Sequence, residues 1–407
     1  MQTQLTSDLL KTAKGQRIDE ILRKCVHCGF CTATCPTYQL TGDELDSPRG
    51  RIYQIKRLFE GQTADHNTQL HLDRCLTCRS CETTCPSGVN YAELLDYGRE
   101  QVNHDVKRPL EQQAILNLLN YVLPYSSRHS LMFKALSKVK KILPKSIRGK
   151  IPTIKPLKQY RAIARQNFQT VYLLEGCVQS TISPNTNQAT LHVLNTMGYQ
   201  VIREAKPKCC GALSHHSGKE EQSNSFILDQ LNTWLEIDQK TPLSAIVSTA
   251  SGCGVMLKDY HRLLTTEQKE LYQNVLNKIC DISELIDVEA LKPKLNVHKN
   301  DIAYHAPCTL NHGQKLADEL FNKLTQLGYS LKQPKDAHLC CGSAGTYSVM
   351  QPELSKQLQH NKLNALAQTG GTKIVTANVG CEHHLASISH LEVKHWIEML
   401  ADDLNQN

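Results

Sequence analysis

Eight of the seventeen cysteines follow one spacing that the chain repeats. The first copy contains Cys25, Cys28, Cys31 and Cys35 followed by Pro36, and the second contains Cys75, Cys78, Cys81 and Cys85 followed by Pro86. The spacing C-x2-C-x2-C-x3-C-P is typical of bacterial ferredoxins with two [4Fe–4S] clusters, whose irons are bound by cysteine thiolates. The repeat therefore predicts two neighbouring centres that pass electrons one at a time.

The fourth cysteine of each copy predicts how the ligands are shared. Three closely spaced cysteines in one loop can reach three irons, whereas the fourth lies past the loop, where the proline steers the chain away. In two-cluster ferredoxins this fourth cysteine binds the other cluster. We therefore expect one [4Fe–4S] cluster on Cys25, Cys28, Cys31 and Cys85, and a second on Cys75, Cys78, Cys81 and Cys35.

Zinc sites and disulfides are the competing uses of cysteine. Zinc ribbons use two separated cysteine pairs, not four cysteines in a row followed by proline. Disulfide frameworks are typical of secreted proteins, but the first sixteen residues, MQTQLTSDLLKTAKGQ, lack the apolar segment of a secretory signal. The pattern favours metal ligands kept in a reducing cytoplasm.

The segments beside the two copies are predicted to be helices. Apolar residues repeat every three positions within residues 49–61, which predicts an amphipathic helix that ends at Gly61. Residues 91–103 show helical spacing as well. We therefore expect residues 1–105 to form an α-helical ferredoxin domain with both clusters in loops between helices.

A basic linker is predicted at residues 106–168. No acidic residue occurs between Glu111 and Glu175, and the same interval holds twelve Lys and Arg residues, so the +7 net charge of the chain is concentrated there. One part has helical spacing, through Met132, Leu136, Val139 and Leu143. Two interpretations remain open: a linker helix packed on its own protein, or a patch for an anionic membrane surface or an acidic partner. The interval has no recognised nucleic-acid reader motif, so we expect no nucleic-acid binding.

The rest of the chain contains an internal repeat, with halves at residues 169–298 and 299–407. Each half has a strand-like run, a single cysteine, a helical stretch, a second strand, a Cys-Cys-Gly triplet, a second helical stretch, a third strand and a final cysteine. Thirty-one residues separate the single cysteine from the double one in both halves. This order predicts two small α/β units with cysteines at strand ends, where parallel sheets bind ligands. Duplication suggests that the units face each other across a pseudo-twofold axis.

Each half offers four cysteines to a further centre. These are Cys177, Cys209, Cys210 and Cys253, and then Cys308, Cys340, Cys341 and Cys381. One hypothesis is an additional iron–sulfur or zinc centre in at least one half, and the other is a set of buried thiols without metal. Cys280 is left over and is expected to be a buried thiol. The histidine pairs at 215–216 and 383–384 are expected to be solvated.

The order of these motifs resembles the electron-transfer subunits related to heterodisulfide reductase. That group includes the C subunit of anaerobic glycerol-3-phosphate dehydrogenase, the lactate-utilisation iron–sulfur proteins and the iron–sulfur subunits of glycolate oxidases. The chain is similar to the glycolate oxidase subunits at residues 25–53, 72–89, 174–187, 249–254, 338–347 and 376–381. In one departure, Met256 and His384 replace the last cysteine of the C-x2-C that ends each heterodisulfide-reductase unit.

The resemblance implies a function within a larger complex. A partner flavoprotein with FAD would oxidise glycolate to glyoxylate and pass electrons to this chain, which would deliver them to a membrane quinone or another acceptor. The resemblance also implies a peripheral location on the inner face of the bacterial cytoplasmic membrane. No apolar run approaches the roughly 18–20 residues that cross a bilayer.

Three alternatives to this function remain. The chain has no Gly-x-Gly-x-x-Gly after a strand and no P-loop, so we expect flavin and substrate to bind to a partner. That partner's substrate could instead be lactate or glycerol 3-phosphate. The chain could also be a disulfide reductase acting at a Cys-Cys-Gly centre, although the missing fifth cysteines argue against it. A redox sensor is the third alternative, but two adjacent clusters exceed what a sensor needs.

Overall fold

The computed structural model describes residues 1–139, 155–161, 169–204, 206–297 and 300–404. The chain divides into two compact units. The first comprises residues 1–117, 216–218 and 338–362, and the second comprises residues 118–215, 219–337 and 363–407. The domain boundaries expected from the sequence, at 105, 168 and 298, stay predictions.

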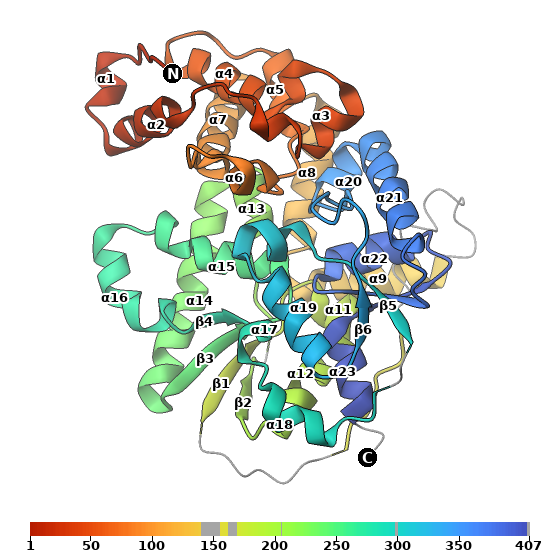
Figure 1. Cartoon of the computed structure of the whole chain (residues 1–407). Helices are drawn as coiled ribbons and strands as arrows, with labels where there is room; N and C mark the ends of the chain where they lie inside the picture. Colours follow the sequence, from red (N-terminus) through yellow and green to blue (C-terminus); the bar gives the residue numbers. More distant parts are fainter. Residues whose placement is uncertain (140–154, 162–168, 205, 298–299, 405–407) are drawn as a thin grey trace. The chain divides into compact units, whose positions relative to one another are not determined.

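The first unit is helical, and its described residues form no strand (Figure 1). Its helices before the basic linker are α1 (Ser7–Leu10), α2 (Ala13–Lys24), α3 (Pro36–Thr41), α4 (Pro48–Phe59), α5 (His66–Asp73), α6 (Ser80–Thr84) and α7 (Tyr91–Asp105). Two short 3-10 helices, η1 (Phe30–Thr32) and η2 (Glu44–Asp46), lie between them. Apolar faces of α2, α4 and α7 form the core, with Ile18, Ile55 and Leu94 fully buried.

Local sequence signals fix the helices that flank the cysteines. Ser47 caps α4 by accepting a hydrogen bond from the Gly50 N–H, and Pro48 occupies the first turn, where no backbone donor is needed. The chain leaves α4 through Gly61, which has a φ of 99°. The helices predicted over residues 49–61 and 91–103 are therefore confirmed as α4 and α7.

The second unit contains two four-stranded parallel sheets (Figure 1). The first has the order β2 (Gln200–Arg203), β1 (Thr170–Leu174), β3 (Leu243–Ser248) and β4 (Ile279–Asp281). The second has the order β6 (Ser330–Lys332), β5 (Asp301–Tyr304), β7 (Lys373–Thr376) and β8 (Glu392–His395). The strand order is the same in both, so the predicted duplication is visible as a repeated topology.

Helices connect the strands and cover the sheets. Those of the first half are α11 (Gln179–Ile182), α12 (Pro184–Thr196), α13 (Ala212–His216), α14 (Glu220–Lys240), α15 (Ser251–Leu263), α16 (Thr266–Leu276), α17 (Ile282–Leu285) and α18 (Val288–Leu291). Those of the second are α19 (Ala317–Gln326), α20 (Tyr347–Met350), α21 (Pro352–Ala367), α22 (Val379–Ala386) and α23 (Trp396–Leu404). The second unit also contains the 3-10 helix η3 (Lys292–Lys294) and the π-helix η4 (Thr309–Gln314).

The two sheets of the second unit share one hydrophobic core. Val171 and Val247 of the first sheet belong to the same buried cluster as Ile302 and Val375 of the second. Polar contacts between the halves are reciprocal: Ser251 at the start of α15 bonds to Thr309 of η4, and His383 of α22 bonds to Ser183 before α12. Such an exchange between equivalent elements agrees with the expected pseudo-twofold relation.

The linker is described in part. It begins with α8 (Leu110–Val122) and α9 (Ser126–Val139). The predicted helical stretch includes Met132 and Leu136 on α9, whereas Leu143 lies outside the described residues. In the part of the chain that the structure describes, no helix combines the length and apolar character needed to span a bilayer.

Candidate metal centres

The two cysteine copies adopt the same backbone pattern in the first unit. A residue with positive φ stands between the first and second cysteines of each copy, His27 at 56° and Thr77 at 53°. Another stands after the second cysteine, Gly29 at 87° and Arg79 at 60°. These left-handed residues turn the chain sharply within one short loop. The turns bring three closely spaced cysteines of each loop to the wall of one pocket.

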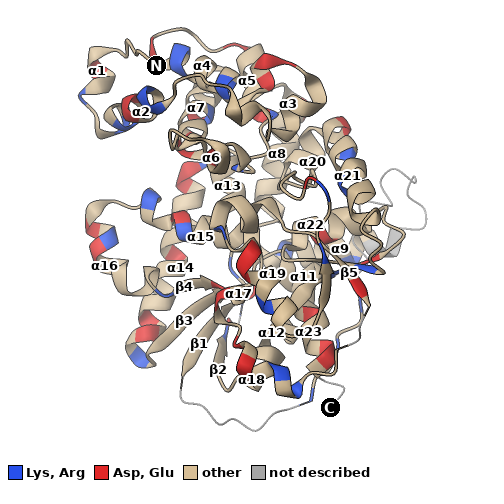
Figure 2. Ribbon diagram, viewed as in Figure 1, with Lys and Arg blue, Asp and Glu red and all other residues tan. Residues whose placement is uncertain are grey.

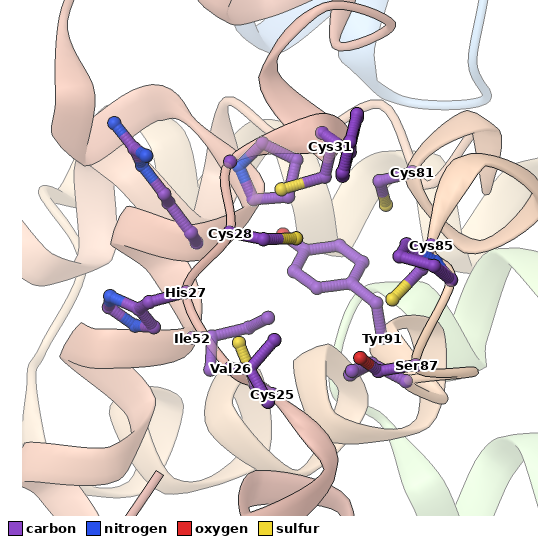
Figure 3. A pocket seen from close by; sticks show the side chains of 16 residues that line it. Cys25, Val26, His27, Cys28, Cys31, Ile52, Cys81, Cys85, Ser87 and Tyr91 are labelled. Atoms are coloured by element: carbon purple, nitrogen blue, oxygen red, sulfur yellow. The ribbon is translucent and has the colours of Figure 1, made fainter.

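The first pocket combines cysteines from both copies. Its wall contains Cys25, Cys28 and Cys31 of the first loop together with Cys85, and Cys81 also borders it. Figure 3 shows the sulfurs of the first three directed toward the same space as that of Cys85. The remaining wall is mostly apolar, with contributions from Val26, Phe30, Pro48, Ile52, Pro86, Val89 and Tyr91.

The second pocket contains the other four cysteines. Cys75, Cys78 and Cys81 of the second loop line it with Cys35 of the first copy. The structure therefore groups the cysteines as the crossed pairing expects, while the ligation itself stays a prediction. Tyr91 lines both pockets, and its hydroxyl lies 3.6 Å from the Cys75 sulfur.

A buried ionic network borders the second pocket. Arg51, which lines the pocket, is fully buried and donates to the Asp46 carboxylate at 3.4 Å. The Asp46 carboxylate also accepts a hydrogen bond from Arg74 at 3.0 Å and lies 2.8 Å from the His71 Nδ1. Two guanidinium groups thus share one carboxylate, which leaves the network with a net positive charge when His71 is neutral.

Burial controls the thiol chemistry of both pockets. It raises the pKa of Cys31 to about 11 and raises the pKa of Cys25 and Cys81 above the ordinary thiol value. Neighbouring thiols add to each shift because several thiolates repel one another. A metal centre would replace these protons and neutralise the gathered sulfurs. Four sulfurs directed into one mostly apolar space, twice over, fit [4Fe–4S] clusters in chemistry and number of donors.

A third group of sulfurs lies in the first half of the repeat. Cys209 interacts with both Cys177 and Cys210, and Cys210 interacts with Cys253, so all four predicted cysteines of this half meet. Hydrogen bonds from Cys209 and Cys253 hold the pKa of Cys210 below its usual range. The group is enclosed, and the Tyr260 hydroxyl donates to the Cys210 carbonyl at 2.8 Å. This donor set fits a four-coordinate metal centre.

The cysteines of the second half are divided between the two units. Cys340 and Cys341 belong to the first unit, and Cys308 and Cys381 belong to the second. The two Cys-Cys-Gly triplets nevertheless share their local geometry. The Gly211 N–H points to the Cys209 sulfur at 3.4 Å, and the Gly342 N–H points to the Cys340 sulfur at 3.4 Å.

The structure changes two expectations about the remaining candidates. His383 is not simply solvated, because its Nε2 lies 2.8 Å from the Ser183 hydroxyl and burial lowers its pKa to about 4. Cys280 lies on the short edge strand β4 and is half-buried, and burial raises its pKa to about 12. All seventeen cysteines are described, and none forms a disulfide.

Sequence reasoning missed Arg51, Asp46 and Tyr91 as neighbours of the second pocket. Arg51 stands on the helix predicted between the two copies, at a position that helical spacing alone leaves ambiguous. Asp46 precedes that helix in η2, and Tyr91 begins α7. No local signal marks Arg51 as buried, because a charged residue on an amphipathic helix is usually solvated.

Two protein-family comparisons match this architecture. The 4Fe-4S dicluster domain family matches residues 21–89, and the cysteine-rich domain family matches residues 171–258 and 302–386. Over the full length of both chains, this chain is 44% identical to the glycolate oxidase iron–sulfur subunit of Escherichia coli strain K12. The chain belongs to the family of glycolate oxidase iron–sulfur subunits.

Other relatives show how far the architecture extends. The probable glycolate oxidase iron–sulfur subunit of Bacillus subtilis strain 168 is 30% identical over 90% of this chain and 89% of its own length. Lactate utilization protein A of an Exiguobacterium species is 25% identical over 58% of this chain and 98% of its own length. This chain itself combines a match to the 4Fe-4S dicluster domain with two matches to the cysteine-rich domain.

Proposed function

We propose that this chain is the electron-transfer subunit of a glycolate-oxidising complex, with one [4Fe–4S] cluster in each pocket of the first unit. The observation that carries this proposal is the grouping of eight cysteines around two pockets, four for each proposed cluster. The two pockets are neighbours, because Cys81 and Tyr91 line both of them. A [4Fe–4S] cluster accepts and releases one electron at a time. FAD on a partner would take two electrons from the hydroxy acid and release them singly to this chain.

The protein's own residues hold the sulfurs and exclude water. The left-handed turns at 27, 29, 77 and 79 aim the cysteines of each loop, and the two loops contact each other through Thr34, which lies next to Ser80 and Thr84. Tyr91 covers one side of both pockets, and its ring is buried. The hydroxyl groups of Tyr91 and Thr37 lie 3.6 and 3.2 Å from the sulfurs of Cys75 and Cys35.

Single serine substitutions test the crossed ligation. If Cys85 belongs to the first site, Cys85→Ser removes the same EPR signal of the reduced protein as Cys28→Ser. Cys35→Ser removes the other signal, as does Cys78→Ser. The pairing is wrong if Cys85→Ser behaves like Cys78→Ser. Cys280→Ser is the matched control and leaves both signals and the iron content unchanged.

The first site is the one that a partner can approach. Cys28 is exposed, and the flanking side chains of Val26 and Phe30 are 65% and 62% exposed. Lys and Arg residues occupy the last turns of α2 and α4 (Figure 2). Three of these four basic side chains pair with carboxylates of the chain itself, so the exposed apolar centre is the feature that suits a flavoprotein with an apolar docking surface.

Glycolate oxidation by the isolated complex tests the substrate. Tagged chain, purified with its bound flavoprotein subunits, is expected to reduce an electron-accepting dye with glycolate. Deletion of the chain should abolish growth on glycolate. If lactate or glycerol 3-phosphate drives dye reduction and glycolate does not, the substrate assignment is wrong while the electron-transfer role stands. Normal growth of the deletion strain on glycolate would contradict the proposal as a whole.

A further centre on Cys177, Cys209, Cys210 and Cys253 is a second proposal. The convergence of all four sulfurs in an enclosed part of the first half supports it. Anaerobically purified protein would then contain about twelve irons, or about eight irons with one zinc, because each [4Fe–4S] cluster holds four irons. Eight irons without zinc would mean that these thiols bind no metal. Turnover of a disulfide by the isolated chain would revive the disulfide-reductase alternative.

We also propose that the linker helices contact an anionic membrane surface on the cytoplasmic side. Four apolar side chains on α8 and α9 are exposed: Leu110 by 89%, Leu118 by 59%, Tyr121 by 62% and Leu131 by 72%. Lys134 lies on the same helix as Leu131 and is exposed. Binding to vesicles with anionic lipid should weaken as salt is raised and in Leu131→Asp. Leu271→Asp, which changes a leucine on α16 that is 58% exposed, is the control.

A further inference from the structure

Arg51 of α4 lines the second pocket and carries a buried positive charge. It is fully buried and lines the pocket beside Cys35, Cys75 and Cys81. Three hydrogen bonds fix its guanidinium group: Nε donates to the His71 carbonyl at 2.7 Å, Nη1 to the Thr37 hydroxyl at 3.1 Å, and Nη2 to Asp46 at 3.4 Å. The position of its charge is therefore set by the fold.

The bond to Thr37 connects Arg51 to a cysteine sulfur. The Thr37 hydroxyl lies 3.2 Å from the Cys35 sulfur. The Thr37 hydroxyl also donates to the Asp46 carbonyl at 3.2 Å, so its single hydrogen has two neighbouring acceptors once Cys35 is a thiolate. Arg51 donates to the Thr37 oxygen and thereby helps to hold this hydroxyl beside the sulfur. Arg51 thus acts on the second site directly by charge and also positions a hydroxyl next to Cys35.

An arginine also lines the first pocket, but its environment differs from that of Arg51. Arg49 lines that pocket, but its side chain is 34% exposed and it pairs with Glu44 through both Nε and Nη2. Water and the carboxylate screen this charge. Arg51 shares its carboxylate with Arg74 and has no water around it. The two arginines, two residues apart on one helix, therefore act with unequal strength on the two pockets.

We infer that Arg51 is a positioning residue that raises the reduction potential of the second site selectively. The inference rests on the proposed function, because it requires a [4Fe–4S] cluster on Cys75, Cys78, Cys81 and Cys35. Reduction adds one negative charge to that site, and a buried positive charge stabilises the reduced form. An electron that enters at the exposed first site is thereby drawn toward the second.

Charge-changing variants with opposite expected signs test this role. Arg51→Gln removes the positive charge and should shift the potential of the second-site EPR signal to a more negative value. Asp46→Asn removes the neutralising carboxylate and should shift it to a more positive value. Arg51→Lys keeps the charge and should retain most of the wild-type potential. The first-site signal should stay unchanged in all three, when redox titrations are performed on the purified full chain.

Two controls separate charge from damage to the fold. Arg49→Gln makes the same change beside the first pocket and should shift the first-site potential less than Arg51→Gln shifts the second. Shifts of Arg51→Gln and Asp46→Asn in the same direction, or no shift at full iron content, would overturn the inference. If Arg51→Gln does not assemble its clusters, the inference is tested by results from the other two variants. They are the direction of the potential shift in Asp46→Asn and the retained potential in Arg51→Lys. Absence of any [4Fe–4S] signal from the wild-type chain would instead refute the proposed function.

Discussion

The hydroxyl of Tyr91 lies 3.6 Å from the sulfur of Cys75, and its ring lines both pockets. Hydrogen bonds to cluster sulfurs raise a reduction potential because they stabilise the extra negative charge of the reduced state. Burial keeps this phenol protonated, since it raises the Tyr91 pKa well above the ordinary value. Tyr91 is therefore available as a donor to one sulfur of the second site at any physiological pH.

Tyr91→Phe is expected to lower the potential of the second site and leave the first nearly unchanged. A lost hydrogen bond of about 0.5–1.5 kcal/mol corresponds to roughly 20–65 mV for a one-electron couple. The ring remains, so both clusters should assemble to wild-type iron content. Potentiometric EPR titration measures the shift. Equal shifts at both sites would show that the ring, rather than the hydroxyl, is responsible.

Glu382 is a second residue whose environment makes a measurable prediction. Burial raises its pKa to about 8, and the nearby Glu398 adds to the shift, whereas Lys155, Lys394 and a hydrogen bond from Ser183 oppose it. A folded-state pKa above the unfolded value of 4.5 favours folding below pH 4.5. This contribution is lost as pH rises through 8. Its neighbour His383 has the opposite sign, because a pKa of about 4 costs stability as pH falls below 6.5.

In Glu382→Gln, the free energy of unfolding should therefore decrease less than in the wild type as pH rises. The variant should lie close to the wild type near pH 5 and gain about 3–4 kcal/mol relative to it by pH 8, since the folded-state pKa of about 8 lies well above 4.5 and each unit of pKa difference is worth about 1.4 kcal/mol. Chemical denaturation monitored between pH 5 and 8 provides the measurement. Glu270→Gln, at an exposed position on α16, is the control and should follow the wild-type profile. Parallel profiles for Glu382→Gln and the wild type would contradict the assignment.

The main elements could be predicted from the sequence wherever local spacing determines them. Apolar spacing predicted α4 and α7, and the repeated Cys-Cys-Gly order predicted the duplicated α/β halves. The fourth strand of each sheet was missed. β4 has only three residues, Ile279–Asp281, which is too short for a period of two to be recognised. Short edge strands are defined by the neighbour that they pair with, here β3.

The surroundings of the second pocket could not be predicted, because they depend on tertiary contacts. Arg51 and His71 are separated by twenty residues, and their bond forms only when α4 and α5 pack. A charged residue on an amphipathic helix is usually solvated, and nothing in local spacing marks Arg51 as buried. The cysteine quartets could be predicted because their spacing is itself the signal, whereas the groups that tune them lack a comparable signal.

The glycines of the two Cys-Cys-Gly triplets allow a comparison between equivalent elements. Gly211 and Gly342 have φ values of 85° and 88°, and each accepts a serine hydroxyl at its carbonyl, from Ser223 and Ser355. A Cβ at Gly342 would lie 2.6 Å from the Ser355 carbonyl oxygen. At Gly211 the nearest atom, the Ser223 hydroxyl oxygen, would be 3.1 Å away.

Gly342→Ala is accordingly expected to be more harmful than Gly211→Ala. Both variants force alanine into the left-handed region at a cost of about 1–2 kcal/mol, and Gly342→Ala adds a backbone clash that brings the loss to roughly 3–4 kcal/mol. Denaturation midpoints of the two variants measure the difference. Gly370→Ala, at a φ of 75° with open space around the added carbon, isolates the conformational cost. Equal losses for all three variants would show that the close approach contributes nothing.

At the scale of the whole chain, the ferredoxin-type cysteines and the tryptophans lie in different units. The eight ferredoxin-type cysteines belong to the first unit, whereas both tryptophans, Trp234 and Trp396, are fully buried in the second. Trp396 belongs to the core shared by the two sheets, and Trp234 packs in the cluster that contains Cys210. Tryptophan emission therefore reports on the second unit only, and Trp396 reports on the core shared by the two sheets.

Removal of iron by a chelator under reducing conditions should unfold the first unit selectively. Its loops place several thiols in apolar surroundings, and its small core loses the cross-links that the metal supplies. In a Trp234→Phe variant, the emission of Trp396 should stay blue-shifted, because an aliphatic core shared by two sheets does not depend on metal. Proteolysis should meanwhile cut within residues 1–117. A red shift of Trp396 in parallel with iron loss would show instead that the two units fold as one cooperative structure.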